Sequence, residues 1–598
     1  MPKDLARTVR TLANLAPTQV AWRLLRTVQR RLPPPQVVQT PPTTRAFDPG
    51  IARQHLAWLP LATAADAASR LRRGEIDLLG QPWSLRHGRP MDRANDSANE
   101  SGESTIDWRL GSCPDQRLET ITLHYREWLE PVVAMVAAAS DDPTDQSKQT
   151  ACQSFEEVLA SWRAAIAADP RGAQPLALNS YAIATRLITT LRQFAAVPSL
   201  ADDAELDCLY RSVDWLAKRV EWDVRANHLL RDGVGLLWAA AFFEPANRRE
   251  TSRWRSLGER IVSREVPRQL GLPDGLHYER SGHYHLEFVR DLLAVAAYQR
   301  TTGRTVLTPV EGSSPLVRAA AAIADVLHPD GLTHGFSDGQ VESADDVIAA
   351  IARAAPTFSM RPPTQGLLKP SGFARLVAGE WTVFLNAGPP GPREQPGHTH
   401  ADALAVEVSH RSRRVLVDPG TFHYDAGPRR CHDRSTAAHN TVFIDGRDSS
   451  EVWHIFRMGR RTRVTAEMLD DRSVSARRET VGQPRHRRRV QVDAASVLID
   501  DRLVPGDGLS HRYSARFLLP HPWQGRLESD CVVLTCDGVT LVFEAELAEA
   551  GDDEATLSLT IEPAAWSPRY LVDEPATCVQ WEVETSGPLA VLTRLRSE

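Results

Sequence analysis

The feature that most constrains the fold is a change in hydrophobic periodicity near Pro362-Pro363. Upstream, from about Leu118 to Ala355, apolar residues recur at the three- and four-residue spacing of amphipathic helices. Downstream, apolar and polar residues alternate, as in half-buried β-strands. The sequence therefore predicts a helical N-terminal half followed by an antiparallel β C-terminal half, and its 598 residues are too many for one ordinary core.

The helices predicted upstream are long, apolar on one face and joined by short connectors: 176–196, 200–223, 227–243, 253–270, 285–301 and 314–327. Short connectors favour antiparallel hairpins of helices stacked in sequence. We therefore expect residues 51–362 to form stacked helical hairpins, as in a helical (α/α) toroid or solenoid. Residues 1–50 are expected to hold an amphipathic helix, which continues through Arg31, and a proline-rich linker.

The strands predicted downstream fall at 372–377, 381–385, 403–408, 557–561 and 578–583. A further hairpin is expected at 531–543, because Asp537-Gly538 is a favoured two-residue turn. We therefore expect residues 363–598 to form an antiparallel β-sandwich.

Composition excludes several classes of protein. A net charge of -6 gives no overall electrostatic reason to bind nucleic acid. The odd count of seven cysteines, without tight spacing, argues against a disulfide framework. No apolar run is long enough to span a membrane. The N-terminus lacks the apolar core of a secretory signal, so cytoplasmic residence is expected, with the periplasm or cell envelope as the alternative. A homodimer is a possible assembly.

Arginines are concentrated between Arg457 and Arg489, in a segment that also contains Arg477, Arg478 and Arg488. Such a run is most often a solvated face. The alternative is a surface that attracts an acidic polymer, because guanidinium groups pair with carboxylates and sulfates in a bidentate manner.

Histidines and a carboxylate recur at strand ends in the C-terminal half: His398 and His400, Asp418 after an apolar strand, and His439 before another. Residues at i and i+2 of an extended strand point the same way, so His398 and His400 are expected on one face. Adjacent strands could bring imidazole, carboxylate and imidazole to one point, a ligand set suited to zinc or a similar divalent ion. Histidines that simply hydrogen-bond in the interior are the alternative.

A second cluster lies in the helical half. Asn227 and His228 begin an otherwise apolar helix, where they could be caps or polar donors at the mouth of a toroid. Downstream, the segment from His277 to His285 is rich in aromatic and ionisable residues for a connector. It contains Tyr284.

The order of these motifs resembles that of the heparinase II/III-like polysaccharide lyases, which include alginate and oligoalginate lyases. The matching segments are Asn-His before an apolar helix, Glu-Arg-Ser-x-x-Tyr-His, His-x-His-x-Asp, Val-Asp-Pro-Gly-Thr and Ala-His-Asn-Thr. Ile106-Asp107-Trp108 and Leu123-His124-Tyr125 add weaker matches.

The resemblance implies a helical toroid on a β-sandwich, with an acidic glycan in the cleft between them. It assigns Asn227 and His228 to the binding and neutralisation of a uronate carboxylate. Tyr284 and His398 match catalytic residues, and Tyr424 falls near the second catalytic tyrosine of the alginate-cleaving relatives.

The resemblance also makes His400, Asp418 and His439 zinc ligands, and we expect this zinc to be structural. Arg280 is expected beside the substrate. Arg280, His283 and His285 are candidates for the cationic neighbour that would lower the pKa of Tyr284. One position departs from heparinase II, which has an acidic residue where this chain has Arg231.

The function implied is β-elimination at a uronate in an acidic polysaccharide, which leaves unsaturated uronate ends. Tyr284 or His398 could be the base, and Tyr284 could protonate the leaving oxygen. Two alternatives remain open: a non-catalytic glycan-binding or exopolysaccharide-assembly protein on a lyase scaffold, and a zinc-dependent hydrolase.

Overall fold

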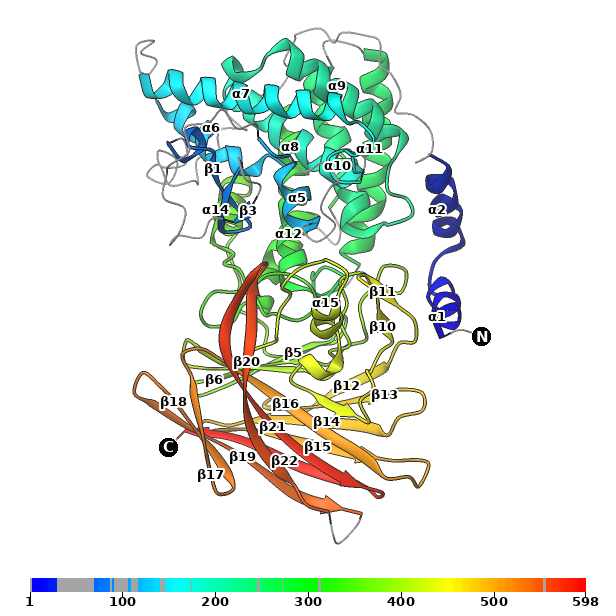
Figure 1. Ribbon diagram of the computed structural model, residues 1–598, viewed down its shortest axis with the longest axis vertical. Coiled ribbons are helices and arrows are strands. Elements are labelled where there is room, and N and C mark those ends of the chain that lie inside the picture. Colours follow the sequence, from blue (N-terminus) through cyan, green and yellow to red (C-terminus); the bar gives the residue numbers. More distant parts are fainter. Residues whose placement is uncertain are drawn as a thin grey trace.

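The computed structural model describes residues 3–29, 69–85, 89–90, 106–108, 117–139, 146–173, 175–244, 248–271, 273–309, 313–551 and 555–597. A helical half is followed in the chain by a half built of antiparallel sheets, and the two are stacked along the long axis of the molecule (Figure 1). The predicted fold class is therefore confirmed. The predicted linker and most of residues 51–71 lie outside the described residues.

The main helices of the first half are α5 (Arg117–Leu123), α6 (Glu130–Ala138), α7 (Gln146–Ala168), α8 (Ser180–Ala196), α9 (Asp203–Lys218), α10 (Ala226–Phe243), α11 (Arg248–Gln269), α12 (Gly282–Thr302), α13 (Pro315–Ala322) and α14 (Asp345–Ala354). A small sheet of β1 (Glu75–Leu78), β2 (Gln81–Ser84) and β3 (Arg89–Pro90) lies beside them. The last of these helices ends at Ala354, and the first strand of the β half begins at Gly366.

Helix α10 is the centre of the helical half. It contacts α8, α9, α11 and α12, and every residue from Leu229 to Phe243 is buried. An all-round apolar helix can be stable only inside such a layer. Gly235 allows the closest approach, because a Cβ there would lie 3.0 Å from the Cα of Ala184 in α8.

Three larger sheets form the second half. One contains β4 (Gly366–Leu368), β5 (Phe373–Ala378), β6 (Trp381–Asn386), β7 (Val406–His410) and β8 (Arg413–Leu416) in that order. The second has the order β20 (Ser558–Arg569), β21 (Val572–Thr585), β16 (His511–Pro520) and β9 (Val442–Ile444).

The third sheet has eight strands in the order β12 (Arg463–Asp470), β13 (Ser473–Glu479), β14 (Arg485–Val492), β15 (Ser496–Val504), β22 (Leu589–Ser597), β19 (Val539–Ala550), β18 (Cys531–Cys536) and β17 (Gln524–Glu528). β18 and β19 are joined by Asp537-Gly538 as predicted, and both turn residues have positive φ. The three sheets share one apolar core, to which Leu376, Val490 and Phe517 contribute. Short pieces β10 (Val452–Trp453), β11 (Arg457–Met458) and α15 (Pro428–Asp433) lie in the connections.

The arginine-rich segment alternates between the inside and outside of the eight-stranded sheet. Arg478 and Arg488 are buried, whereas Arg477, Arg485 and Arg487 are exposed. Some arginines of this segment therefore form a solvated face, and others are buried and hydrogen-bonded inside the β half.

Arg488 is the most connected of these buried arginines. Its Nε and Nη2 donate to the two carboxylate oxygens of Asp501 at 2.7 and 2.8 Å. Its Nη1 donates to the carbonyl oxygens of Leu404 and Asn440 at 2.8 and 2.7 Å. The guanidinium thereby fixes to the sheet the two segments that carry His400 and His439, two of the three predicted metal ligands.

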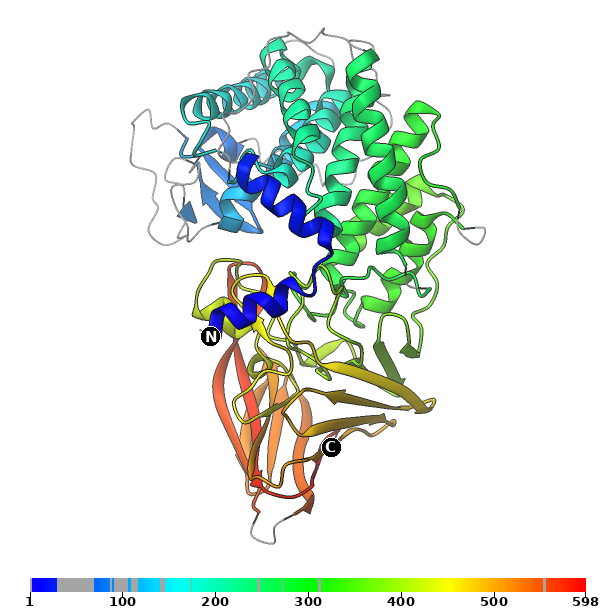
Figure 2. The ribbon, with the colours of Figure 1, turned by 90° about the vertical axis from the view of Figure 1, so that its right-hand side faces the viewer.

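The N-terminal segment lies along one side of both halves (Figure 2). It forms two helices, α1 (Lys3–Leu12) and α2 (Pro17–Gln29), instead of the single helix predicted, and Pro17 begins the second one. Arg10 pairs with Glu451 of the β half, and Arg26 pairs with Asp223 of the helical half at 2.9 Å.

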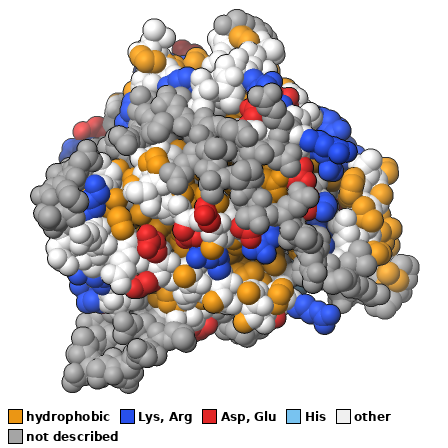
Figure 3. Space-filling model, turned by 90° about the horizontal axis from the view of Figure 1, so that it is seen from above, with side chains coloured by type: hydrophobic (Ala, Val, Ile, Leu, Met, Phe, Trp, Pro, Cys, Tyr) orange, Lys and Arg blue, Asp and Glu red, His pale blue; other side chains and the backbone are white. Residues whose placement is uncertain are grey.

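Seen from the helical end, acidic and basic side chains are interspersed over the described surface (Figure 3). None of the helices in the described ranges is long and apolar enough to cross a membrane. The cysteines in these ranges are all free: Cys152, Cys208, Cys431, Cys531, Cys536 and Cys578.

We predict that Asp501→Asn lowers the free energy of unfolding by about 3 kcal/mol, because Arg488 would stay buried without its carboxylate. Burial alone would raise the pKa of Asp501, but Arg488 and His486 more than offset this and lower it. The carboxylate therefore stabilises the fold above the pKa of the unfolded chain, about 4, and its effect fades as the pH falls below that value. Urea denaturation at several pH values measures this.

Glu544→Gln is the matched control, since Glu544 pairs with Arg596 at 2.9 Å on the exposed surface. Its loss is expected to cost less than about 1 kcal/mol. Equal losses in the two variants would contradict the role given to Arg488.

Candidate functional site

A cavity of about 270 Å³ lies where the two halves meet. Its lining comes mainly from α5, the starts of α8, α10 and α12, the loop between β6 and β7, the loop after β8, and the β20–β21 turn. The structure thus brings together, from distant parts of the chain, the predicted residues Asn227, His228, Tyr284, His398 and Tyr424.

Asn227 enters the cavity from a strained turn. Arg225 and Ala226, which precede it, have φ of 68° and 52°, an unusual backbone for residues other than glycine. The Oδ1 atom of Asn227 is buried without a hydrogen-bond partner in the described structure. The Asn227 side chain therefore does not cap the helix in this structure, and an unpaired buried amide oxygen is unfavourable unless a ligand or water pairs with it.

His228, one residue further on, is held from behind by a carboxylate. Its Nδ1 lies 2.8 Å from Oε2 of Glu221, and its ring lies 4.6 Å from that of Tyr181. Burial alone would raise the pKa of Glu221, but His228 and Arg26 more than offset this and lower it. An ionised Glu221 can accept the Nδ1 proton and leave Nε2 as the free nitrogen.

His398 and Tyr284 form a stacked pair across the junction of the two halves. Their rings are 3.7 Å apart and within 8° of parallel. Tyr284 is fixed in the first turn of α12, whose N-cap Ser281 accepts from the Tyr284 amide at 3.2 Å. The Nδ1 atom of His398 lies 2.5 Å from Oε2 of Glu279, and Oε1 of the same carboxylate accepts from the Asn227 amide at 3.4 Å.

Tyr284 also belongs to a chain of phenols. Its hydroxyl lies 3.0 Å from that of Tyr424, which lies 2.8 Å from that of Tyr570. Burial, the largest effect, raises the pKa of each of the three phenols. The expectation that cationic neighbours lower the pKa of Tyr284 is therefore wrong: its phenol is neutral, a state suited to giving a proton.

The structure places Arg280 outside the cavity lining. Its Nη2 donates to Oδ1 of Asn386 at 2.6 Å, and its other nitrogens donate to the carbonyl oxygens of Ser371 and Pro389. The prediction that Arg280 contacts the substrate is therefore wrong. Its guanidinium donates to these acceptors instead and links the helical half to the β half.

Arg231, the position that departs from heparinase II, is buried and neutralised. Its guanidinium pairs with Glu287 at 3.0 Å and with Asp291 at 2.6 Å. Glu287 lines the cavity, so this region presents an acidic group despite the arginine.

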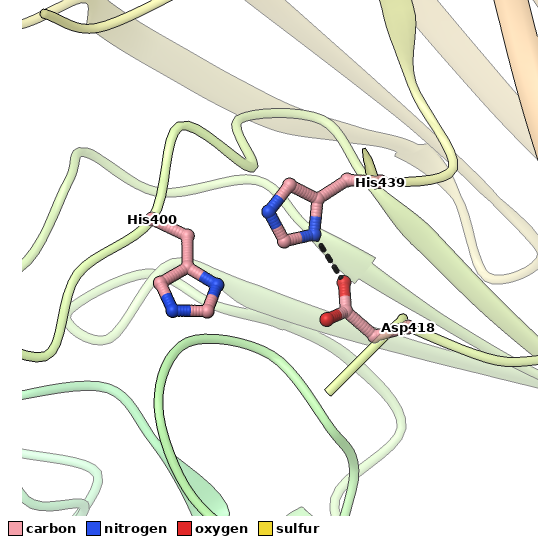
Figure 4. Close-up of side chains that lie close together, drawn as sticks. All are labelled: His400, Asp418 and His439. Atoms are coloured by element: carbon pink, nitrogen blue, oxygen red, sulfur yellow. Dashed lines mark hydrogen bonds and ion pairs between the residues drawn. The ribbon is translucent and has the colours of Figure 1, made fainter. Parts of the chain in front are cut away.

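The predicted metal ligands His400, Asp418 and His439 form a separate cluster (Figure 4). One ligand atom from each lies within 4.8 Å of the others, and all three residues are buried. His439 Nδ1 lies 2.8 Å from Asp418 Oδ2, while His400 Nδ1 and His439 Nε2 are buried without hydrogen-bond partners. Two orphaned imidazole nitrogens beside a carboxylate fit a divalent cation.

The local conformation differs from the prediction. His398 and His400 lie in an irregular loop before β7, not on a strand, and their rings do not share a face. His398 is directed to Glu279 and Tyr284, whereas His400 Nε2 bonds to Oδ1 of Asp338 at 2.7 Å.

The sequence comparisons identify the family. Residues 92–365 match the model described as heparinase II/III N-terminus, and residues 360–594 match heparinase II/III-like, C-terminal. This chain belongs to the heparinase II/III-like family. None of the curated protein sequences compared with it matches.

Solved structures agree with this family in fold. A heparinase III is similar over 97% of this chain and 92% of its own, with 15% identity and a TM-score of 0.69. The heparan sulfate lyase HepC from Pedobacter heparinus covers 90% and 88%, with 17% identity and a TM-score of 0.55. The Streptomyces coelicolor A3 chondroitin AC lyase in complex with chondroitin sulphate covers 92% and 82%, with 11% identity and a TM-score of 0.53.

Sequence reasoning missed several residues of this heparinase II/III-like site. Glu279 was within a quoted motif, and its charge next to Arg280 was the signal available. Glu221 and Tyr570 carried no local signal, because only the folded chain brings them to His228 and Tyr424.

We predict that the purified protein binds about one divalent metal ion per chain, and that His439→Ala abolishes this binding because it removes one of three ligands. His432→Ala, an exposed histidine on α15, is the control and should keep the metal. Elemental analysis of the dialysed proteins measures this. Equal metal content in the two variants would contradict the assignment.

Proposed function

We propose that this protein is a polysaccharide lyase that cleaves a uronate-containing acidic polymer by β-elimination. The observation that carries the proposal is the stacked pair of Tyr284 and His398, which faces Asn227 and His228 in one cavity. Elimination at a uronate needs a base at the C5 proton, an acid at the leaving O4 oxygen, and groups that offset the carboxylate charge. The cavity offers each of these.

Asn227 and His228 are the carboxylate-binding groups of this proposal. The Asn227 side chain can turn its amide nitrogen to the uronate and donate to the carboxylate, since rotation of the amide exchanges its oxygen and nitrogen. With its Nδ1–H donating to Glu221, His228 can donate to the uronate from Nε2 when both ring nitrogens carry protons, and this imidazolium form is the one that the proposal uses. Donors at these two points stabilise the enolate-like charge that develops when the C5 proton leaves.

We assign the base to His398 and the acid to Tyr284. Burial tends to raise the pKa of Glu279, but His398 more than offsets this and lowers it, so Glu279 is an ionised acceptor for the Nδ1 proton. The free Nε2 atom of His398 can then take the C5 proton, with Glu279 balancing the imidazolium charge. Neutral Tyr284 gives its proton to O4.

The zinc-dependent hydrolase is less well supported. His400, Asp418 and His439 are buried and do not line the cavity. A cation held there would fix the loops that carry His398 and His439, and it would supply no water to the substrate. We therefore propose that any such ion is structural, whether zinc or another divalent metal.

The substrate class follows from the same groups, which recognise a carboxylate and a glycosidic oxygen. Heparan sulfate and chondroitin sulphate, named for two of the similar solved structures, are the first polymers to test. Alginate, hyaluronan and bacterial exopolysaccharides complete the panel. The cytoplasmic or envelope location and the homodimer stay predictions.

We predict that Tyr284→Phe reduces kcat by at least about 10²-fold, the usual contribution of general acid catalysis. The ring and its stacking on His398 are kept, so folding and glycan binding should be unchanged. The ultraviolet absorbance of the new C4=C5 double bond follows the reaction, and calorimetry follows binding.

Three results of this experiment differ in meaning. If the wild-type protein cleaves a polymer and the Tyr284→Phe variant cleaves it equally well, Tyr284 is not the acid. Binding without any absorbance change, across the whole panel, would favour the non-catalytic glycan-binding protein. Cleavage products without the double bond would favour the hydrolase.

We also predict that Glu279→Gln lowers kcat by about tenfold or more, because a charge-assisted hydrogen bond to the base is lost. Glu265→Gln is the control: Glu265 is a buried carboxylate of the same half, bonded to Gln269 at 3.4 Å and outside the cavity lining. It should change kcat by less than about twofold. Similar losses in both variants would indicate general destabilisation, which thermal unfolding would reveal.

A further inference from the structure

The hairpin of β20 and β21 brings a residue from the end of the chain into the cavity. Arg569 pairs with Val572, so Tyr570 and Leu571 form the turn, in which Leu571 has a φ of 64°. The hairpin rises from the β half towards the helical half (Figure 1), and Tyr570 lines the cavity.

Backbone hydrogen bonds hold this turn on both sides. The Val341 amide donates to the Pro568 carbonyl at 2.7 Å, and the Leu571 amide donates to the Phe422 carbonyl at 2.8 Å. Tyr570 itself is 4% exposed, and its ring meets the edge of His283 at 5.9 Å. The position of its hydroxyl is therefore set by the fold.

That hydroxyl belongs to the same group of three phenols. It lies 2.8 Å from the hydroxyl of Tyr424, and Tyr424 lies 3.0 Å from Tyr284. A phenol both donates and accepts, so all three O–H groups can point in one direction, from Tyr570 through Tyr424 to Tyr284.

We propose that Tyr570 is a positioning residue that acts through Tyr424 to stabilise Tyr284 after it has given its proton to the leaving oxygen. This inference rests on the proposed function. As the C5–H bond breaks, its proton passes to His398, its electron pair forms the C4=C5 bond, and the C4–O4 bond breaks. O4 takes the proton of Tyr284, whose oxygen now accepts from Tyr424, as Tyr424 accepts from Tyr570. His398 later loses a proton to water and Tyr284 regains one, so protons balance.

The test is Tyr570→Phe, which removes one hydroxyl and keeps the ring. We expect kcat on the polymer to fall about fivefold to tenfold, the usual worth of a hydrogen bond between neutral groups, with KM changed less than about twofold. With a synthetic uronate that carries a nitrophenolate leaving group at C4, which needs no protonation, the loss should disappear. In a Tyr424→Phe background, the added loss from Tyr570→Phe should also disappear.

Tyr513→Phe is the matched control, because the buried Tyr513 hydroxyl of β16 has no hydrogen-bond partner in the described structure. It should leave kcat unchanged on both substrates. A Tyr570→Phe variant that loses activity equally on both substrates would overturn the inference and indicate a packing role. So would unchanged kcat on the polymer, or losses that simply add in the Tyr424→Phe background.

The failure of the proposed function looks different. Wild-type protein that yields no unsaturated product from any polymer overturns the lyase and this inference together. Wild-type activity that survives Tyr570→Phe unchanged overturns the inference alone.

Discussion

The site depends on one buried carboxylate, that of Glu279. One of its oxygens accepts from the amide of Asn227 in the helical half, and the other bonds to His398 in the β half. Removing a carboxylate from water is costly, and these two partners offset the cost only when both halves are in place. The geometry of the cavity is therefore coupled to the docking of the two halves.

The same arrangement recurs at the cavity and in the neighbouring cluster of predicted metal ligands. Glu221 holds His228, and Asp338 holds His400 and a bidentate Arg430, whose guanidinium lies over the ring of Tyr424 at 4.9 Å. Each histidine thus has one nitrogen fixed by a carboxylate and the other left for a substrate or a cation. The protein prepares these groups before a ligand arrives, and a preorganised site needs little rearrangement during reaction.

Much of the fold was readable from the chain. The helix at 227–243 and the turn at Asp537-Gly538 depend on local patterns, and the structure confirms them. The change of period near Pro362 falls between the last helix of the first half and the first strand of the second. The loop of His398 and His400 was misjudged as a strand, because alternation over a few residues does not distinguish a strand from an irregular loop held by side chains. Arg280 was misplaced for a related reason: a guanidinium near a motif does not reveal which carbonyl oxygens will accept from it.

The sequence by itself determined the two halves and the residue types the site would contain, since periodicity and motif order are local properties of the chain. Only the tertiary structure decided which groups meet. It brought Glu279 to His398 and Glu221 to His228. It also brought Tyr570 to Tyr424, across 146 positions of the chain. Such contacts depend on the packing of whole helices and sheets, which no short segment encodes.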